Sequence, residues 1–150
     1  MIKKNFIIVF IFLFVSNCGY EPLKSRKTNF SLKLVDSGGN KKINYIIKNR
    51  LKIYEEGDNN YNLEIVDSNI NKIATSMDTK GNPKTFQMTI NLIINLNKNP
   101  DFVIEGKSFA TKTNYNTISS KFDLKKYEDN LIENLTQKIL DELILYIQTL

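Results

Sequence analysis

The chain has 150 residues, one cysteine, no histidine and a formal net charge of +5. A chain of this length fits one domain, and one cysteine excludes a disulfide within it. Without histidine, neither a Ser-His-Asp triad nor a zinc site that uses imidazole can be built from these residues. The excess of basic residues is small and is not concentrated in one patch, so nucleic-acid binding is not predicted.

The first residues have the pattern of a bacterial export signal. Lys3 and Lys4 precede an unbroken apolar run from Phe6 to Val15. Ten residues of helix span about 15 Å, which is half the thickness of a bilayer core and too short for a transmembrane helix. Residues 1–17 are therefore predicted to be a cleaved signal peptide.

The signal ends in Val15-Ser16-Asn17-Cys18, an apolar residue followed by two residues and a cysteine. This order is typical of lipoprotein signals, although Gly or Ala usually stands where Asn17 does. We predict that Cys18 becomes the lipid-bearing first residue, which would tie the chain firmly to a membrane. An ordinary secretory signal with an incidental cysteine is the alternative. Residues 18–29 are predicted to form a polar tether, and residues 30–150 a single domain.

The first half of that domain reads as a strand, a helix and a second strand. Apolar and polar residues alternate over 30–35, which predicts a half-buried strand. After a Gly-rich break, Asn40 is placed to cap an amphipathic helix that ends near Gly57. Alternation resumes at Tyr61 and changes phase further on, so a second strand is predicted to reach about Met77 with a bulge near 67–69.

The second half reads as two strands and a long helix. Residues 78–84 form a loop, and the strict alternation over 86–96 predicts a strand. After a turn at 98–101, a fourth strand is predicted over 102–110. Phe102, Ile104, Gly106, Ser108 and Ala110 lie on one face of this strand, and we expect that face to point inward because its small residues allow a helix to pack closely. A polar stretch over 111–120 then precedes a helix over about 124–147.

The order of elements is therefore β-α-β-β-β-α. We predict an α+β, two-layer sandwich in which two amphipathic helices cover one face of a four-stranded mixed sheet. The other face would carry Thr89, Asn91 and Asn95, and this pattern suits either a wet surface or a contact surface.

The sequence offers little catalytic chemistry. Gly38-Gly39 lacks the rest of a phosphate-binding loop, and acidic pairs such as Glu55-Glu56 lie in helical segments where charge is ordinary surface. We predict a protein that is not an enzyme and needs no cofactor or metal.

Several short strings, taken in order, resemble one family. They are Cys18-Gly19-Tyr20-Glu21-Pro22-Leu23, Asp36-Ser37-Gly38, Asn49-Arg50-Leu51, Lys84-Thr85-Phe86-Gln87-Met88-Thr89-Ile90, Thr113-Asn114-Tyr115-Asn116 and Leu145-Tyr146-Ile147. Because these strings occur in this order behind a lipoprotein signal, the chain resembles the LPS-assembly lipoprotein family LptE over nearly its whole length.

The resemblance implies a role without catalysis. Members of that family sit at the periplasmic face of the outer membrane, plug the LptD-type β-barrel, help it to assemble, and bind lipopolysaccharide (LPS) in transit. Gly19 after Cys18, rather than the Asp that retains some lipoproteins at the inner membrane, agrees with that location.

The family's basic LPS contacts lie on the loop before the aromatic-x-Met strand and just before the last helix. Lys80 and Lys121 fall at or next to those places, and Lys84 is a nearby candidate. A free-standing periplasmic lipid carrier or transporter-auxiliary lipoprotein, with no barrel partner, is the alternative function.

Overall fold

The computed structural model describes residues 30–57, 59–99 and 102–150, so the predicted signal peptide, Cys18 and the tether lie outside the described residues. The elements, in chain order, are β1 (Ser31–Ser37), α2 (Lys41–Leu51), a 3-10 turn η2 (Lys52–Tyr54), β2 (Asn60–Met77), β3 (Pro83–Asn99), β4 (Phe102–Asn116) and α3 (Lys121–Gln148).

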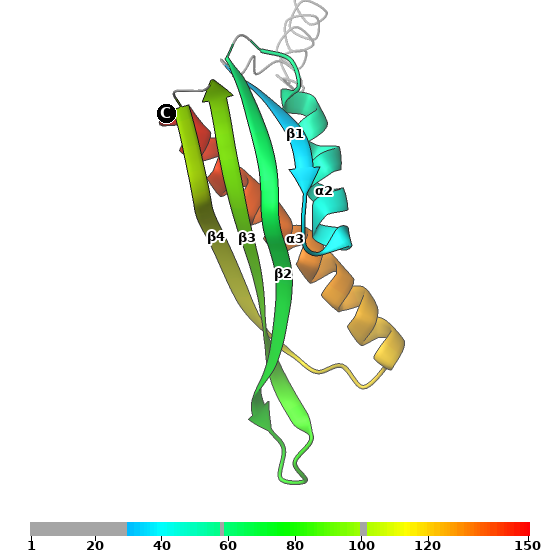
Figure 1. Ribbon diagram of the computed structural model, residues 1–150. Helices are drawn as coiled ribbons and strands as arrows, with labels where there is room; N and C mark the ends of the chain where they lie inside the picture. The colour runs from blue at the N-terminus through cyan, green and yellow to red at the C-terminus, as the bar shows by residue number, and fades with distance from the viewer. Residues whose placement is uncertain (1–29, 58, 100–101) are drawn as a thin grey trace, which may run out of the picture.

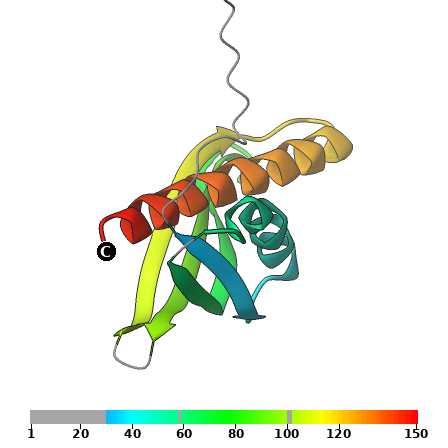
Figure 2. The ribbon, with the colours of Figure 1, turned by 90° about the horizontal axis from the view of Figure 1, so that it is seen from above.

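The four strands form one mixed sheet in the order β1-β2-β3-β4. β1 runs parallel to β2, and α2 makes the connection that two parallel neighbours need. The β2–β3 and β3–β4 pairs are antiparallel. Both helices lie on the same face of the sheet, with α3 crossing it beside α2 (Figures 1 and 2). The predicted two-layer architecture and its element order are therefore confirmed.

The predicted cap of the first helix is confirmed, but the helix is shorter than expected. The Asn40 side chain accepts hydrogen bonds from the backbone N–H groups of Lys42 (3.0 Å) and Ile43 (3.2 Å). Regular helix ends at Leu51, and the tighter turn η2 replaces the last predicted turn before Gly57.

The predicted bulge in β2 is also confirmed, one residue earlier than expected. The pairing with β3 shifts between Ile65 and Asp67, so Val66 is the extra residue. Leu63 and Ile65 are buried before the bulge, and Ser68 is buried after it. The bulge therefore keeps the inward face continuous although the sequence alternation changes phase.

Another bulge, in β4, overturns the predicted inward face of that strand. Ile104 pairs with Leu96 and Lys107 with Ile94, so Glu105 and Gly106 together oppose the single residue Asn95. Beyond this point the buried residues are Phe109 and Tyr115, while Ser108 and Ala110 are exposed. The strand also continues to Asn116, through residues that were expected to be a polar connection.

The last helix supplies one side of the core. α3 begins at Lys121, three residues before the predicted start, and its buried row follows the predicted i, i+4 spacing. This row packs on the inner faces of β4 and β3 in one contiguous core. Its buried members are Ile132, Leu135, Thr136, Ile139, Leu140, Leu143, Ile144 and Ile147. Among the described residues, no helix combines the length and apolarity that crossing a bilayer requires.

Candidate functional site

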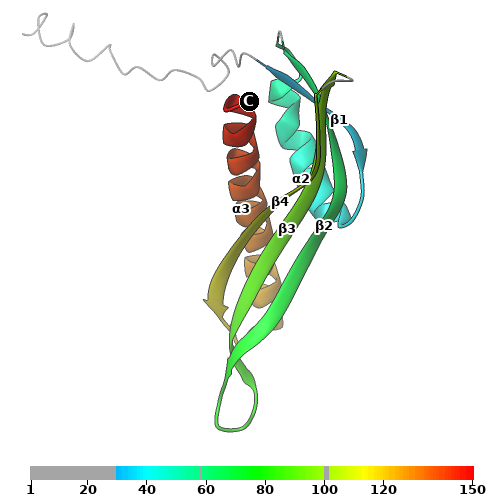
Figure 3. The ribbon, with the colours of Figure 1, turned by 60° about the vertical axis from the view of Figure 1, so that its left-hand side comes forward.

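β2 and β3 form a long hairpin that projects past the start of α3 (Figures 1 and 3). β1 pairs with β2 only from Ser31 to Ser37, and β4 pairs with β3 only as far as Thr85. The part of the hairpin around residues 77–83 therefore has no neighbouring strand on either side. We call this projecting hairpin, together with residues 116–122 that lead from its base to the first turn of α3, the hairpin end.

The tip of the hairpin is a hydrogen-bonded turn built around Asp78. Its carboxylate accepts the backbone N–H groups of Lys80 and Asn82, each at 2.8 Å, and the Asn82 side-chain amide at 3.1 Å. The Asn82 side chain is the largest cause that holds the pKa of Asp78 below its ordinary value. The turn is therefore most stable at pH values above the ordinary pKa of a carboxyl group, and it is weakened as the pH falls through the lowered pKa of Asp78.

The base of the hairpin is joined to α3 through Glu128. The Tyr115 hydroxyl donates to Glu128 Oε1 at 2.7 Å, and Lys72 Nζ lies 2.6 Å from the same oxygen. Lys72 also sits 4.1 Å from the centre of the Phe86 ring, which stacks on Tyr115. Burial first, and then Glu128, raise the pKa of Tyr115, so its hydroxyl keeps its proton and remains a donor.

This junction predicts a measurable coupling. Tyr115→Phe removes one donor and is expected to cost about 1 kcal/mol of the free energy of unfolding. Glu128→Ala is expected to cost about 2–3 kcal/mol, because it leaves Lys72 and the buried Tyr115 hydroxyl without their acceptor. Urea titrations of both single variants and the double variant measure the coupling energy. Additive losses would show that Tyr115 and Glu128 do not stabilise the junction together.

Asp129→Ala is the matched control. Asp129 is the next residue on α3 and pairs with Lys42 at the surface, where both side chains are about half exposed (41% and 49%). Solvent screens such a pair, so the unfolding midpoint is expected to move less than in Glu128→Ala.

The three lysines predicted from sequence all lie at the hairpin end. Lys80 is in the tip turn, and Lys121 is the first residue of α3, after the cap Ser120. The backbone oxygen of Lys84 accepts the N–H of Thr117 at 2.9 Å, so Lys84 lies beside the segment that leads to Lys121. Lys80 lies four residues before Lys84, nearer the tip of the hairpin. All three are exposed, and none forms an ion pair within the described part of the chain.

Apolar side chains that the sequence analysis missed lie close to these lysines in the chain. Phe122 is 77% exposed, Met77 is 56% exposed and Ile118 is 36% exposed. Phe122 falls outside the apolar row of α3, and the helix had been expected to begin after it. The missed signal was the large apolar residue next to Lys121. The hairpin end therefore combines free cations with exposed apolar surface, a combination that suits an anionic amphiphile.

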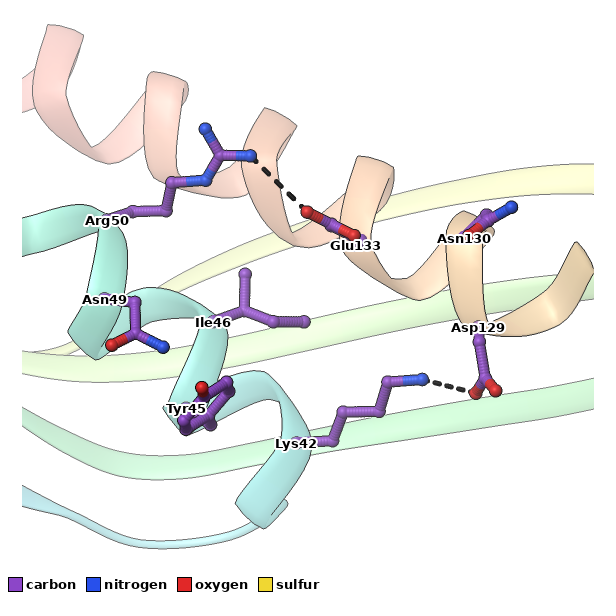
Figure 4. Close-up of a pocket in the computed structure, with 8 residues that line it drawn as sticks. All are labelled: Lys42, Tyr45, Ile46, Asn49, Arg50, Asp129, Asn130 and Glu133. Carbon is purple, nitrogen blue, oxygen red and sulfur yellow. Dashed lines mark hydrogen bonds and ion pairs between the residues drawn. The ribbon is translucent and has the colours of Figure 1, made fainter. Parts of the chain in front are cut away.

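A hollow lies between the two helices. It has a volume of about 320 Å³ and is lined by charged, amide and tyrosine side chains of α2 and α3. Its charges are already paired: Lys42 contacts Asp129, and Arg50 lies 3.5 Å from Glu133 (Figure 4). These pairs join the helices across the hollow and leave no net charge there for a ligand. Within the described residues, no group of three acidic, Cys or His residues is placed to hold a metal.

The fold of this chain is similar to that of several solved lipoprotein structures. No family model matches the sequence, and neither does any curated protein. The crystal structure of rare lipoprotein B from Shewanella oneidensis matches 79% of this chain and 94% of its own, with a TM-score of 0.64 and 11% identity. The chain has the rare lipoprotein B fold.

Two further structures share this rare lipoprotein B fold. The solution structure of an uncharacterized lipoprotein B from Nitrosomonas europaea covers 78% of this chain and 81% of its own, with a TM-score of 0.57 and 9% identity. A minor lipoprotein from Acinetobacter baumannii covers 79% and 93%, with a TM-score of 0.53 and 14% identity. This is the LptE-like fold that the sequence resemblance predicted, and identities this low support the fold alone.

Proposed function

We propose that this chain is an outer-membrane lipoprotein, attached through Cys18, that plugs an LptD-type β-barrel and binds LPS during its transport to the cell surface. The observation that carries this function is the rare lipoprotein B fold, which spans nearly the whole domain behind a lipoprotein-type signal. A two-layer domain of this size can fill a barrel lumen as a unit.

The open face of the sheet supports the plug. It is lined by side-chain amides that bond across strands: Asn91 donates to Asn69 at 2.9 Å, and Gln87 donates to Asn114 at 3.1 Å. Asn95 donates to Glu64 at 2.8 Å and accepts the Gly106 N–H at 2.9 Å. Such a face stays compatible with water and can exchange hydrogen bonds with the polar wall of a barrel.

The hairpin end supports the LPS interaction. Lys80, Lys84 and Lys121 offer charge-assisted hydrogen bonds to the phosphates of an LPS head group. Exposed Phe122 and Met77 offer apolar contact to acyl chains. Both halves of an anionic amphiphile are therefore matched at one end of the molecule.

The lipid anchor has a direct test. Cells grown with labelled palmitate should label the wild-type chain and should not label Cys18→Ser, which lacks the acceptor sulfur. The variant should also leave the membrane fraction, because two or more acyl chains supply the anchoring. Asn17→Gly places the usual small residue before the cysteine and should be labelled at least as well as the wild type. Undiminished labelling of Cys18→Ser would contradict the anchor.

A further inference from the structure

α2 and the first residue of η2 carry a narrow stripe of side chains that lie outside the core and make no ion pair with α3, although Tyr45 also lines the hollow between the helices. Lys41, Tyr45, Lys48 and Lys52 follow one another at i, i+4, i+7 and i+11, and we call these four residues the α2 basic stripe. All four are exposed, and Tyr45 is 69% exposed. The buried residues of the same helix lie on a different side of its axis and face the sheet.

The lysines of the stripe differ from the other cations of α2. Lys42 and Arg50 are paired with α3 across the hollow of Figure 4. The stripe lysines have no ion pair within the described residues, and α2 itself contains no acidic residue. Glu55, which follows η2, lines a small hollow together with Lys48 and forms no ion pair with it. Three free positive charges therefore run along the helix.

Apolar and aromatic side chains accompany these charges. Ile53, next to Lys52, is 68% exposed, and Tyr45 lies between Lys41 and Lys48. A surface that carried charge for solubility alone would not need these large side chains. Lysines whose stems cover apolar surface, interspersed with an exposed tyrosine, are typical of a helix that lies at a lipid head-group region.

The stripe ends where the described domain begins. The Tyr54 ring of η2 stacks on Phe30 with the ring centres 6.0 Å apart. Residues 18–29 separate Phe30 from Cys18 and reach at most about 40 Å when extended. If Cys18 is lipidated, as in the proposed function, the stripe lies within reach of the membrane that holds the anchor.

We propose that the α2 basic stripe binds the surface of a bilayer that contains anionic phospholipid. The three lysines approach lipid phosphates while Tyr45 and Ile53 enter the head-group region. This contact orients the domain on the membrane before the domain enters a barrel. It is separate from the hairpin end, which α2 does not form. Each lysine near an anionic surface is expected to strengthen binding about fivefold.

The chain has no tryptophan, so Tyr45→Trp introduces a single fluorophore into the stripe. The full-length lipidated variant is placed on vesicles of phosphatidylcholine and phosphatidylglycerol in which part of the lipid carries bromine, a contact quencher. The expected result is a blue-shifted emission that the brominated lipid quenches. Leu145→Trp, at an exposed position of α3, is the matched control and should remain unquenched.

Replacing Lys41, Lys48 and Lys52 by Gln in the Tyr45→Trp chain should abolish the quenching, and so should vesicles of phosphatidylcholine alone. Quenching that persists in either case, or no quenching on the anionic vesicles, would overturn the inference. Flotation with phosphatidylcholine vesicles separately measures whether the lipid anchor attaches the chain to a neutral membrane. A chain that fails to float there but still shows quenching on anionic vesicles would contradict the anchor and support the stripe.

Discussion

Reversing the charge of Lys80, Lys84 and Lys121 together to Glu is expected to reduce LPS affinity at least 100-fold. The three side chains are exposed and have no ion pair within the described residues, so they are available to phosphate groups. A hydrogen bond to a charged group contributes about 1.5–3 kcal/mol, and a reversed charge adds repulsion to that loss. Titration of the purified lipoprotein with LPS measures the change.

The control reverses Lys33, Lys98 and Lys138 to Glu, which changes the net charge equally outside the hairpin end. Equal losses in the two triple variants would mean that total charge, rather than this site, governs binding. The pair Lys84 and Lys121 should matter more than Lys80 alone, because Lys84 lies against the segment that leads to α3. Unchanged affinity in the first triple variant would remove these residues from the site.

Gly39→Ala is expected to lower the free energy of unfolding by about 3 kcal/mol or more. Gly39 has a φ of +85°, and a Cβ there would lie 2.2 Å from the Ser68 backbone nitrogen and 2.5 Å from its oxygen. The turn is docked at this point, since Asn40 donates its N–H to the Ser68 backbone oxygen at 2.8 Å. A methyl group would therefore combine backbone strain with displacement of β2.

Gly81→Ala separates these two causes. Gly81 has nearly the same φ, +81°, but a Cβ there would meet nothing within 4 Å. Only the strain of a left-handed conformation remains, which is about 1–2 kcal/mol. Urea unfolding curves followed by circular dichroism compare the two variants. Equal losses would show that the close approach of the turn to Ser68 is not important for stability.

The layer order was predictable because the alternation and the helical rows are strong. The run over 86–96 alternates almost without exception, and its even-numbered apolar residues from Met88 to Leu96 are all buried. A bulge of one residue in β4 was not predictable in the same way. One inserted residue exchanges the two faces of a strand, and Gly106 gave no sign of which way the alternation would resume.

The candidate site was predictable only in its charges. Lys80, Lys84 and Lys121 came from a family resemblance, and the sequence alone did not indicate that the hairpin and the start of α3 would place them at one end. The junction of Lys72, Tyr115 and Glu128 joins residues up to 56 positions apart, so no local pattern shows it. Phe122 was missed because it precedes the apolar row by which the helix was recognised.

The most direct test of the proposed function is to purify the chain from membranes with its partner. A C-terminal tag is added, membranes are dissolved in a mild detergent, and the eluted proteins are identified and quantified. We expect one large outer-membrane β-barrel protein at about one copy per chain. A lipoprotein that elutes alone would contradict the barrel plug and would favour the lipid-carrier alternative.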